Sequence, residues 1–356
     1  MNKEMFISHD DITIIDALKK IDVGGRGILY IINKEQQLEG SVSDGDIRRW
    51  IMKSNNLEEK ITKVMNVNPK FLFKTDIINP ISYIKRHSVT SIPILDRNRK
   101  IYDIIFINGE NELSPKRSEG SLEGIPVVIM AGGKGTRLYP FTKILPKPLI
   151  PIGDIPIVER IIVKFLEYGV SEFFLTVNYK KGMIKAYFSD LMPDYQVTYI
   201  EEEKPLGTGG SLKLIRKKLD KPLFVTNCDT LIETDYNDLY AYHIEAKNDI
   251  TIVSSLKNVT IPYGVLECSE GGNVIKLKEK PNILSYINTG MYIINPEMIE
   301  LIPDNTFYHM THLVEEALNQ KLKVGMYPIS GEAFLDMGEL EEMKHMEEKL
   351  KVKDMF

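Results

Sequence analysis

The stretch Val127–Ile152 reads VVIMAGGKGTRLYPFTKILPKPLIPI, and it decides the fold. It begins with the apolar run Val127 to Met130, as expected of a strand buried in a parallel sheet that is covered on both faces. The loop that follows has almost no side-chain bulk, and its glycines permit a tight turn that brings backbone N–H groups close to a phosphate. We expect these loop residues to lie against a bound phosphate: Ala131, Gly132, Gly133, Gly135 and Thr136.

Two basic residues follow the loop. Arg137 offers a fixed fork of N–H donors that suits phosphate oxygens, and Lys147 lies on a segment stiffened by a proline on each side. The loop lacks both the ending of a P-loop and the GxGxxG order of a dinucleotide fold. The whole stretch instead resembles the signature of the sugar-1-phosphate nucleotidyltransferases, and the resemblance runs from Ile125 over about two thirds of the chain. The alternative is a glycine-rich turn with incidental basic residues.

Composition sets the class of protein. The chain has 356 residues, of which 43% are hydrophobic and 27% charged, which is ordinary for a soluble protein of two domains. Its net charge of −5 argues against general binding of nucleic acid. The two cysteines favour reduced thiols over a disulfide framework. The first residues do not read as a signal peptide, and no apolar run is long enough for a membrane span. We therefore expect a cytoplasmic protein that contacts neither nucleic acid nor membrane.

The N-terminal part contains a weak internal repeat. YIINKEQQLEGSVSD (Tyr30 to Asp44) aligns with PILDRNRKIYDIIFI (Pro93 to Ile107) at an offset of 63 residues. Each copy reads as a strand, a polar turn and a strand, and each follows a short amphipathic segment. The first copy continues as GSVSDGDIRRWI, which resembles the nucleotide-binding turn of CBS domains, and these occur as tandem pairs.

The resemblance to CBS domains implies a regulatory nucleotide site. In that family a hydroxyl residue and a following aspartate hold an adenosine nucleotide, and the matching residues are Ser43 and Asp46. Asp46 also reads as a plain cap of a helix over residues 47–52. In the second copy Phe106 and Gly109 stand at these positions, so we expect one adenosine site or none. A purely structural or dimerising pair is the alternative.

These patterns predict the domain order. Residues 1–110 form the small α+β CBS pair, through which the resemblance implies a homodimer, and residues 111–124 form a polar linker. Residues 125–356 form an α/β domain, a doubly wound, mostly parallel, Rossmann-like nucleotidyltransferase sheet. In such sheets ligands bind beyond the carboxyl ends of the strands, where the glycine loop also lies.

A second loop of small residues lies in EEEKPLGTGGSL, Glu201 to Leu212. Gly207 and Gly209 let the backbone approach a flat base. In the family an acidic or amide residue just before this loop reads the base edge. Any of the three glutamates can accept from the N1–H and amine of guanine, and we favour Glu202. An ordinary solvated acidic turn is the alternative.

The metal and sugar residues are carried over from the family. LFVTNCDT ends in Asp229, and a carboxylate at the end of a central strand is placed to hold Mg²⁺ on nucleotide phosphates. Asp336 in FLDMGE matches the second Mg²⁺ ligand. The residues matching the family's sugar contacts are Tyr263, Gly264, Glu279, Asn288 and Thr289, and Lys280 matches the lysine that holds the sugar phosphate. His309 and His312 read either as polar residues opening a helix, which we favour, or as a metal pair.

The resemblance implies one reaction. A sugar 1-phosphate attacks the α-phosphate of a nucleoside triphosphate and pyrophosphate leaves, with Arg137, Lys147 and Lys280 as the catalytic cations. The layout is similar to that of the glucosamine-1-phosphate guanylyltransferases of bacterial legionaminic acid biosynthesis, which favours GTP and glucosamine 1-phosphate. Mannose or heptose guanylyltransferases and thymidylyl, uridylyl or cytidylyl transfer are alternatives. A catalytically silent, nucleotide-sensing regulatory protein is an alternative of another class.

Overall fold

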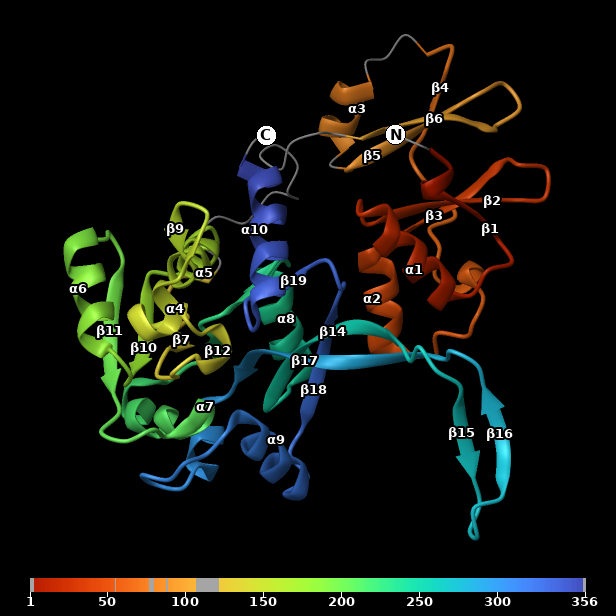
Figure 1. Ribbon diagram of the computed structural model, residues 1–356. Coiled ribbons are helices and arrows are strands. Elements are labelled where there is room, and N and C mark those ends of the chain that lie inside the picture. Colours follow the sequence, from red (N-terminus) through yellow and green to blue (C-terminus); the bar gives the residue numbers. More distant parts are fainter. Residues whose placement is uncertain (1–2, 55, 77–79, 88, 107–121, 355–356) are drawn as a thin grey trace.

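A mixed, mostly parallel sheet forms the centre of the molecule (Figure 1). The computed structural model describes residues 3–54, 56–76, 80–87, 89–106 and 122–354. The strand order is β11 (Gln196–Glu201), β10 (Glu172–Val177), β7 (Val127–Met130), β12 (Leu223–Asn227), β17 (Asn282–Ile294), β14 (Ile250–Thr260) and β18 (Val324–Ile329). β17 runs antiparallel to β12 and β14, and the other neighbouring strands are parallel. The predicted doubly wound α/β sheet is therefore confirmed, with one antiparallel strand inserted.

Helices cover both faces of this sheet. Along β7, Val127 and Ile129 belong to one buried cluster, and Val128 and Met130 belong to another, because successive side chains point to opposite faces. The first cluster takes side chains from α5 (Ile157–Leu166), α6 (Lys181–Leu191), α8 (Tyr236–Ala246) and α10 (Leu340–Asp354). The second takes them from the 3-10 helices η5 (Ser211–Lys218) and η6 (Pro296–Leu301) and from α9 (Met310–Asn319).

The internal repeat is confirmed as structure. The first copy comprises β1 (Ile7–His9), α1 (Ile14–Gly24), β2 (Ile28–Ile32) and β3 (Leu38–Ser43), and the second comprises β4 (Leu72–Phe73), α3 (Pro80–His87), β5 (Ser91–Leu95) and β6 (Ile101–Phe106). In each copy the first strand is parallel to the second, and the second is antiparallel to the third. The two turns match in detail, because Gln36 and Arg99 have left-handed φ values of 65° and 62°. Membership of the CBS family remains a prediction.

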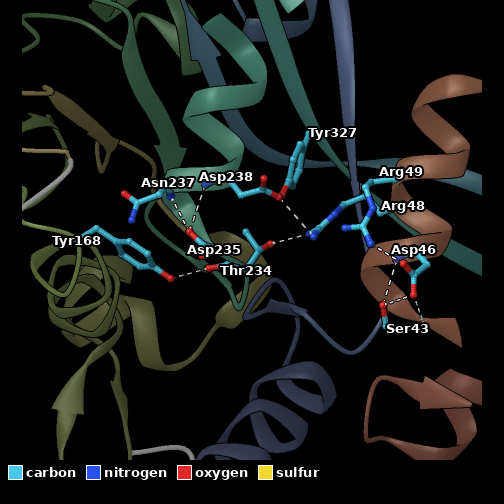
Figure 2. Close-up of polar contacts among 10 residues, drawn as sticks. All are labelled: Ser43, Asp46, Arg48, Arg49, Tyr168, Thr234, Asp235, Asn237, Asp238 and Tyr327. Carbon is cyan, nitrogen blue, oxygen red and sulfur yellow. Dashed lines mark hydrogen bonds and ion pairs between the residues drawn. The ribbon is translucent and has the colours of Figure 1, made fainter. Parts of the chain in front are cut away.

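Helix α2 (Asp44–Lys53) follows β3, and its first turn is a capping box (Figure 2). Ser43 Oγ accepts from the Asp46 N–H at 3.2 Å, and Asp46 Oδ2 accepts from the Ser43 N–H at 2.9 Å. The interpretation of Asp46 as the helix cap is therefore corrected: Ser43 is the N-cap, and Asp46 is the third residue of α2, where its carboxylate completes the capping box. Both polar groups expected to hold an adenosine nucleotide already have partners within the chain. Gly109, their counterpart in the second copy, lies outside the described residues.

The first repeat packs against the central sheet. Its buried cluster, which includes Ile47 and Ile51 of α2, also includes Leu256 of β14. Tyr286 of β17 and Met326 of β18 pack against the same cluster. One apolar core therefore continues from the repeat into the transferase domain.

Leu256→Ala is expected to lower the free energy of unfolding by about 2 kcal/mol, near the low end for truncating a buried leucine. The reason is that the Leu256 side chain fills the junction between the two domains and is 7% exposed. Urea unfolding measures the change. Val259→Ala is the control, because Val259 lies on the same strand and is 48% exposed. Equal losses in the two variants would contradict a packed junction.

The remaining elements are short, apart from one projecting arm. They are η1 (Lys3–Phe6), η2 (Ile61–Lys63), η3 (Thr136–Leu138), α4 (Phe141–Ile144), η4 (Lys147–Leu149), β8 (Pro151–Ile152), β9 (Ile155–Pro156), β13 (Thr230–Ile232), α7 (Gly207–Gly210) and β19 (Phe334–Asp336). β15 (Val265–Cys268) and β16 (Val274–Lys278) form a two-stranded arm that leaves the body between β14 and β17 (Figure 1). Within the described part of the chain, no helix combines the length and apolar character that a membrane crossing needs.

The predicted linker, residues 111–124, lies outside the described residues except for residues 122–124. Leu122 is buried, and its N–H donates to the Tyr168 carbonyl at 3.1 Å. This docked end leads directly into β7.

Candidate active site

The glycine loop lies at the carboxyl end of β7, as expected from the sequence. Gly135 has a φ of 63°, and a Cβ there would lie 2.9 Å from the Thr142 side chain and 3.0 Å from that of Lys147. At Gly132 a Cβ would lie 2.9 Å from Glu202 Oε1, which is the end of a side chain. Glycine is therefore required at Gly135 by close approach and backbone conformation, whereas a larger residue at position 132 would have to displace the Glu202 carboxylate.

A pocket of about 380 Å³ lies above this loop. Most of the residues predicted for the nucleotide and its phosphates line it: Gly132, Gly133, Gly135, Thr136, Arg137, Lys147, Glu202, Gly207 and Asp229. Ala131 instead lies fully buried behind the loop, where its N–H donates to the Thr176 carbonyl at 3.0 Å. Gly209 packs against the chain at His309, whose backbone would lie 3.0 Å from a Cβ at Gly209. Close packing against the His309 backbone therefore explains why position 209 is a glycine.

The three glutamates of the base loop have different surroundings. Glu201 is exposed and forms ion pairs with Lys181 and Lys185. Glu202 is 5% exposed, lines the pocket, and accepts the Leu206 N–H at 3.0 Å through Oε2. Burial raises the pKa of Glu202. Of the three, Glu202 therefore has the position from which a carboxylate can accept hydrogen bonds from a bound base.

Asp229 and Asp336 are held together by a short antiparallel strand pair. Thr230 of β13 lies opposite Asp336 of β19, and the Met337 N–H donates to the Asp229 carbonyl at 2.9 Å. Asp229 also forms an ion pair with Lys147, and both side chains are 11% exposed. Burial, followed by the charges of Asp229 and Glu342, raises the pKa of Asp336 to about 6.

These two carboxylates fit a Mg²⁺ ion that is also held by phosphates. Mg²⁺ in nucleotide sites takes one or two carboxylates and completes its shell with water and phosphate oxygens. Burial and the neighbouring negative charges both raise the pKa of Asp336, and a bound cation relieves the repulsion between those charges. No group of three or more His, Cys, Asp or Glu side chains within the described residues is arranged to hold a metal by itself. Lys147 supplies the positive charge beside Asp229 in this structure.

A second pocket of about 280 Å³ adjoins the first and shares Arg137 and Asp229 with it. Asn288, Thr289 and Asp336 also line it, so these predicted sugar and metal residues are brought together. Asn288 donates to the Tyr292 hydroxyl at 2.6 Å, and Thr289 donates to the Val253 carbonyl at 2.8 Å. The position of both side chains is thus fixed by the sheet.

The other four sugar residues are grouped elsewhere, at the base of the arm. The Lys280 N–H donates to the Tyr263 carbonyl at 3.2 Å, and a Cβ at Gly264 would lie 3.0 Å from Glu279 Oε2. Tyr263 is 73% exposed. None of the four lines either pocket. The long β14–β17 ladder carries them away from Asn288, a path that the motifs alone do not indicate.

His309 is a pocket residue that our reading of the sequence did not select. It lines both pockets, and its Nδ1 lies 3.3 Å from Thr208 Oγ1. His309 and His312 also form the capping box of α9, so the helix-start interpretation is confirmed. His309 lies close to the turn Thr208-Gly209-Gly210 because of long-range packing, and no residue near His309 in the sequence indicates this proximity. Cys228 also borders the first pocket, but it is buried, and burial raises the pKa of its thiol to about 12, as expected of an inert thiol. Both cysteines are free, and Cys268 is exposed.

Comparisons with known proteins agree with this geometry. The family model described as nucleotidyl transferase matches residues 126–352. A mannose-1-phosphate guanyltransferase from Debaryomyces hansenii is 36% identical over 184 residues, which is 49% of this chain and 51% of the relative. Another, from Candida glabrata, is 34% identical over 222 residues, 60% of this chain and 61% of the relative. The chain thus spans about half the length of the curated relatives it matches.

A solved structure shows the same fold. It is a protein from Bacillus anthracis described as a glucose-1-phosphate thymidylyltransferase, in complex with sucrose. The TM-score is 0.52 at 21% identity, and the match covers 65% of this chain and 96% of that one.

Proposed function

The chain belongs to the nucleotidyl transferase family, and from this premise we propose that it joins a nucleoside triphosphate to a sugar 1-phosphate. The products are an NDP-sugar and pyrophosphate. One observation carries the proposal: two adjoining pockets share Arg137 and Asp229, which is the arrangement required when a nucleotide and a second phosphate react with each other.

The proposed chemistry relies on positioning and charge. A sugar 1-phosphate is ionised at neutral pH, so its oxygen forms a bond to the α-phosphorus without a general base while the bond to pyrophosphate breaks. The loop amides and Arg137 hold the leaving phosphates, and Lys147 lies beside the α-phosphate. Asp229 and Asp336 would hold Mg²⁺, which neutralises charge on the phosphate oxygens. Lys280 enters this scheme only if the arm brings it to the pocket.

Guanine is the base that the site supports best. Glu202 is buried in the pocket, and its carboxylate form can accept from both the N1–H and the exocyclic amine of guanine, a donor pair that other common bases lack. The relatives named as mannose-1-phosphate guanyltransferases support the same base. Glucosamine 1-phosphate, from the resemblance to the legionaminic acid enzymes, remains our proposed acceptor. Mannose 1-phosphate is the alternative favoured by the curated relatives.

The test is pyrophosphate release with Mg²⁺ in a matrix of GTP, ATP, UTP, CTP and dTTP against glucosamine, N-acetylglucosamine, mannose, heptose and glucose 1-phosphates. Release with GTP and glucosamine 1-phosphate supports the full proposal. Release with another pair would support the proposed reaction but assign different substrates to it. Silence across the matrix would favour a regulatory protein that senses nucleotides.

Glu202→Gln should reduce the preference for GTP over ITP by roughly 10- to 100-fold, the value of a hydrogen bond to a charged group. ITP lacks only the exocyclic amine, so it isolates the contact with the carboxylate. The measurement is kcat/KM for both triphosphates. Glu201→Gln is the control, because Glu201 is exposed and paired with lysines. An unchanged ratio in Glu202→Gln would remove this residue from base recognition.

For the N-terminal repeat we propose a CBS pair that mediates a homodimer. An adenosine nucleotide at Ser43 and Asp46 would have to exchange with the capping hydrogen bonds. Calorimetric titration of the intact chain with AMP, ADP and ATP tests the nucleotide site. Sedimentation of the intact chain tests the dimer.

A further inference from the structure

The segment that follows Asp229 connects the active site to the domain junction. Asp229 immediately precedes β13, whose pairing with β19 also sets the place of Asp336. At the other end of this strand pair, the Glu233 N–H donates to the Ala333 carbonyl at 2.8 Å. Since β13 directly follows Asp229 and pairs with the strand that carries Asp336, a shift of β13 along its axis changes the position of one carboxylate relative to the other.

The far end of this segment is anchored at Thr234 (Figure 2). The Thr234 carbonyl accepts from the Tyr168 hydroxyl at 3.1 Å. Asp235 then caps helix α8, because its Oδ1 accepts the Asn237 and Asp238 N–H groups at 2.9 Å and 3.2 Å. These contacts all lie within the transferase domain.

Arg48 adds an anchor from outside that domain. It lies on α2 of the first repeat, and Figure 2 shows its guanidinium directed toward the transferase domain. One nitrogen donates to Thr234 Oγ1 at 3.4 Å, and another lies 3.4 Å from Asp238 Oδ2. The guanidinium carbon lies 5.0 Å from the centre of the Tyr327 ring, and the Tyr327 hydroxyl donates to Asp238 at 2.7 Å.

The guanidinium lies in a mostly buried position, although its carboxylate partner does not. The Arg48 side chain is 17% exposed and that of Asp238 is 58% exposed, whereas the Tyr327 ring under the guanidinium is fully buried. A partly desolvated guanidinium that stacks on a ring and has two acceptors is held in one orientation. A fully exposed ion pair, in comparison, adds little to the stability of a protein. The apolar cluster around Leu256 lies at the same junction and keeps α2 in place.

We propose that Arg48 is a positioning residue, through which helix α2 of the first repeat fixes the strand that places Asp229 and Asp336. The inference rests on the proposed function for what the carboxylates do. Arg48 touches neither pocket, so its effect passes through Thr234 and β13. A displacement of reacting groups by a fraction of an ångström is enough to slow a reaction that depends on positioning.

The test compares Arg48→Ala with Arg49→Ala in the full-length protein. Arg49 is the matched control, because it is the next residue of the same helix, its side chain is 65% exposed, and it contacts Asp46 of its own domain. Hydrogen–deuterium exchange of peptides covering residues 230–238 measures the anchoring directly. Binding of Mn²⁺, followed by electron paramagnetic resonance, measures the carboxylate site without any turnover.

In Arg48→Ala we expect exchange in residues 230–238 to be about tenfold faster, the scale of one charge-assisted contact. We expect Mn²⁺ binding to weaken severalfold and kcat to fall about tenfold, with little change in KM for the triphosphate. Arg49→Ala should match the wild type in all these measurements. If Arg48→Ala does not fold, Thr234→Val replaces it, since it removes one acceptor and leaves the arginine and the Tyr168 contact in place.

Two results would overturn the proposal. One is unchanged exchange in residues 230–238, and the other is faster exchange with unchanged Mn²⁺ binding and unchanged kcat. If the wild type turns over no substrate pair, the proposed function fails separately. In that case exchange and Mn²⁺ binding still decide whether Arg48 positions the carboxylates.

Discussion

Asp229→Asn is expected to lower turnover with Mg²⁺ by about 10³-fold, since several kcal/mol of charge stabilisation are lost with a metal-binding carboxylate. Asparagine keeps the size of the side chain and an oxygen for Lys147, but it lacks the charge. Asp229 lines both pockets, so the loss affects the place where the two substrates meet. The measurement is kcat with saturating triphosphate and sugar phosphate over a range of Mg²⁺ concentrations.

The matched control is Asp220→Asn, because Asp220 is an exposed aspartate just before the same central strand. It should retain wild-type turnover. The melting temperature of Asp229→Asn must be recorded as well, because Lys147 loses an ionic partner in a mostly buried site. A folded variant whose turnover stays within tenfold of the wild type would exclude Asp229 as a metal ligand.

Arg137→Ala should lower kcat by roughly 10²- to 10³-fold, the cost of removing one preorganised donor from a developing charge. Arg137 lies just after the glycine loop and lines both pockets. Arg137→Lys keeps the charge and loses the planar fork, so its turnover should lie between that of the wild type and the alanine variant. Single-turnover measurements of pyrophosphate release separate this effect from product release.

Lys134→Ala is the control for Arg137. Lys134 is an exposed cation of the same loop and does not line either pocket. Its removal changes the net charge by the same amount, so any loss it causes measures the general electrostatic effect. Equal losses at the two positions would mean that Arg137 has no specific role.

The sequence predicted best what depends on local chemistry. The run Val127 to Met130 is apolar on both faces, and it forms the strand with helices on each side that such a run indicates. Asp229 was expected at the end of the apolar strand in LFVTNCDT, and it lies just beyond β12. The repeat offset of 63 residues predicted two units with a strand, a polar turn and a strand each, and the structure adds that both turns have a left-handed residue, Gln36 or Arg99.

The sequence did not predict what depends on contacts between distant segments. Gly209 was expected to leave room for a base, whereas its missing Cβ leaves room for the backbone at His309. Nothing near His309 in the chain indicates that contact. Glu279, Lys280 and Tyr263 were all expected to contact the sugar. The structure groups them at the base of the arm, and the β14–β17 ladder sets the direction of that arm. Arg48 likewise reads as an ordinary surface residue of an amphipathic helix until the two domains meet.

The packing of α2 against β18 has a consequence for synthesis of the protein. β18 is an edge strand of the central sheet, and unpaired strand edges favour association between chains. α2 ends at Lys53 and β18 begins at Val324, so the ribosome reaches β18 roughly 15 to 55 s after completing α2, at 5–20 residues per second. The first repeat therefore has time to fold before its partner strand emerges. The folded repeat is then available to pack against β18 as soon as that strand emerges.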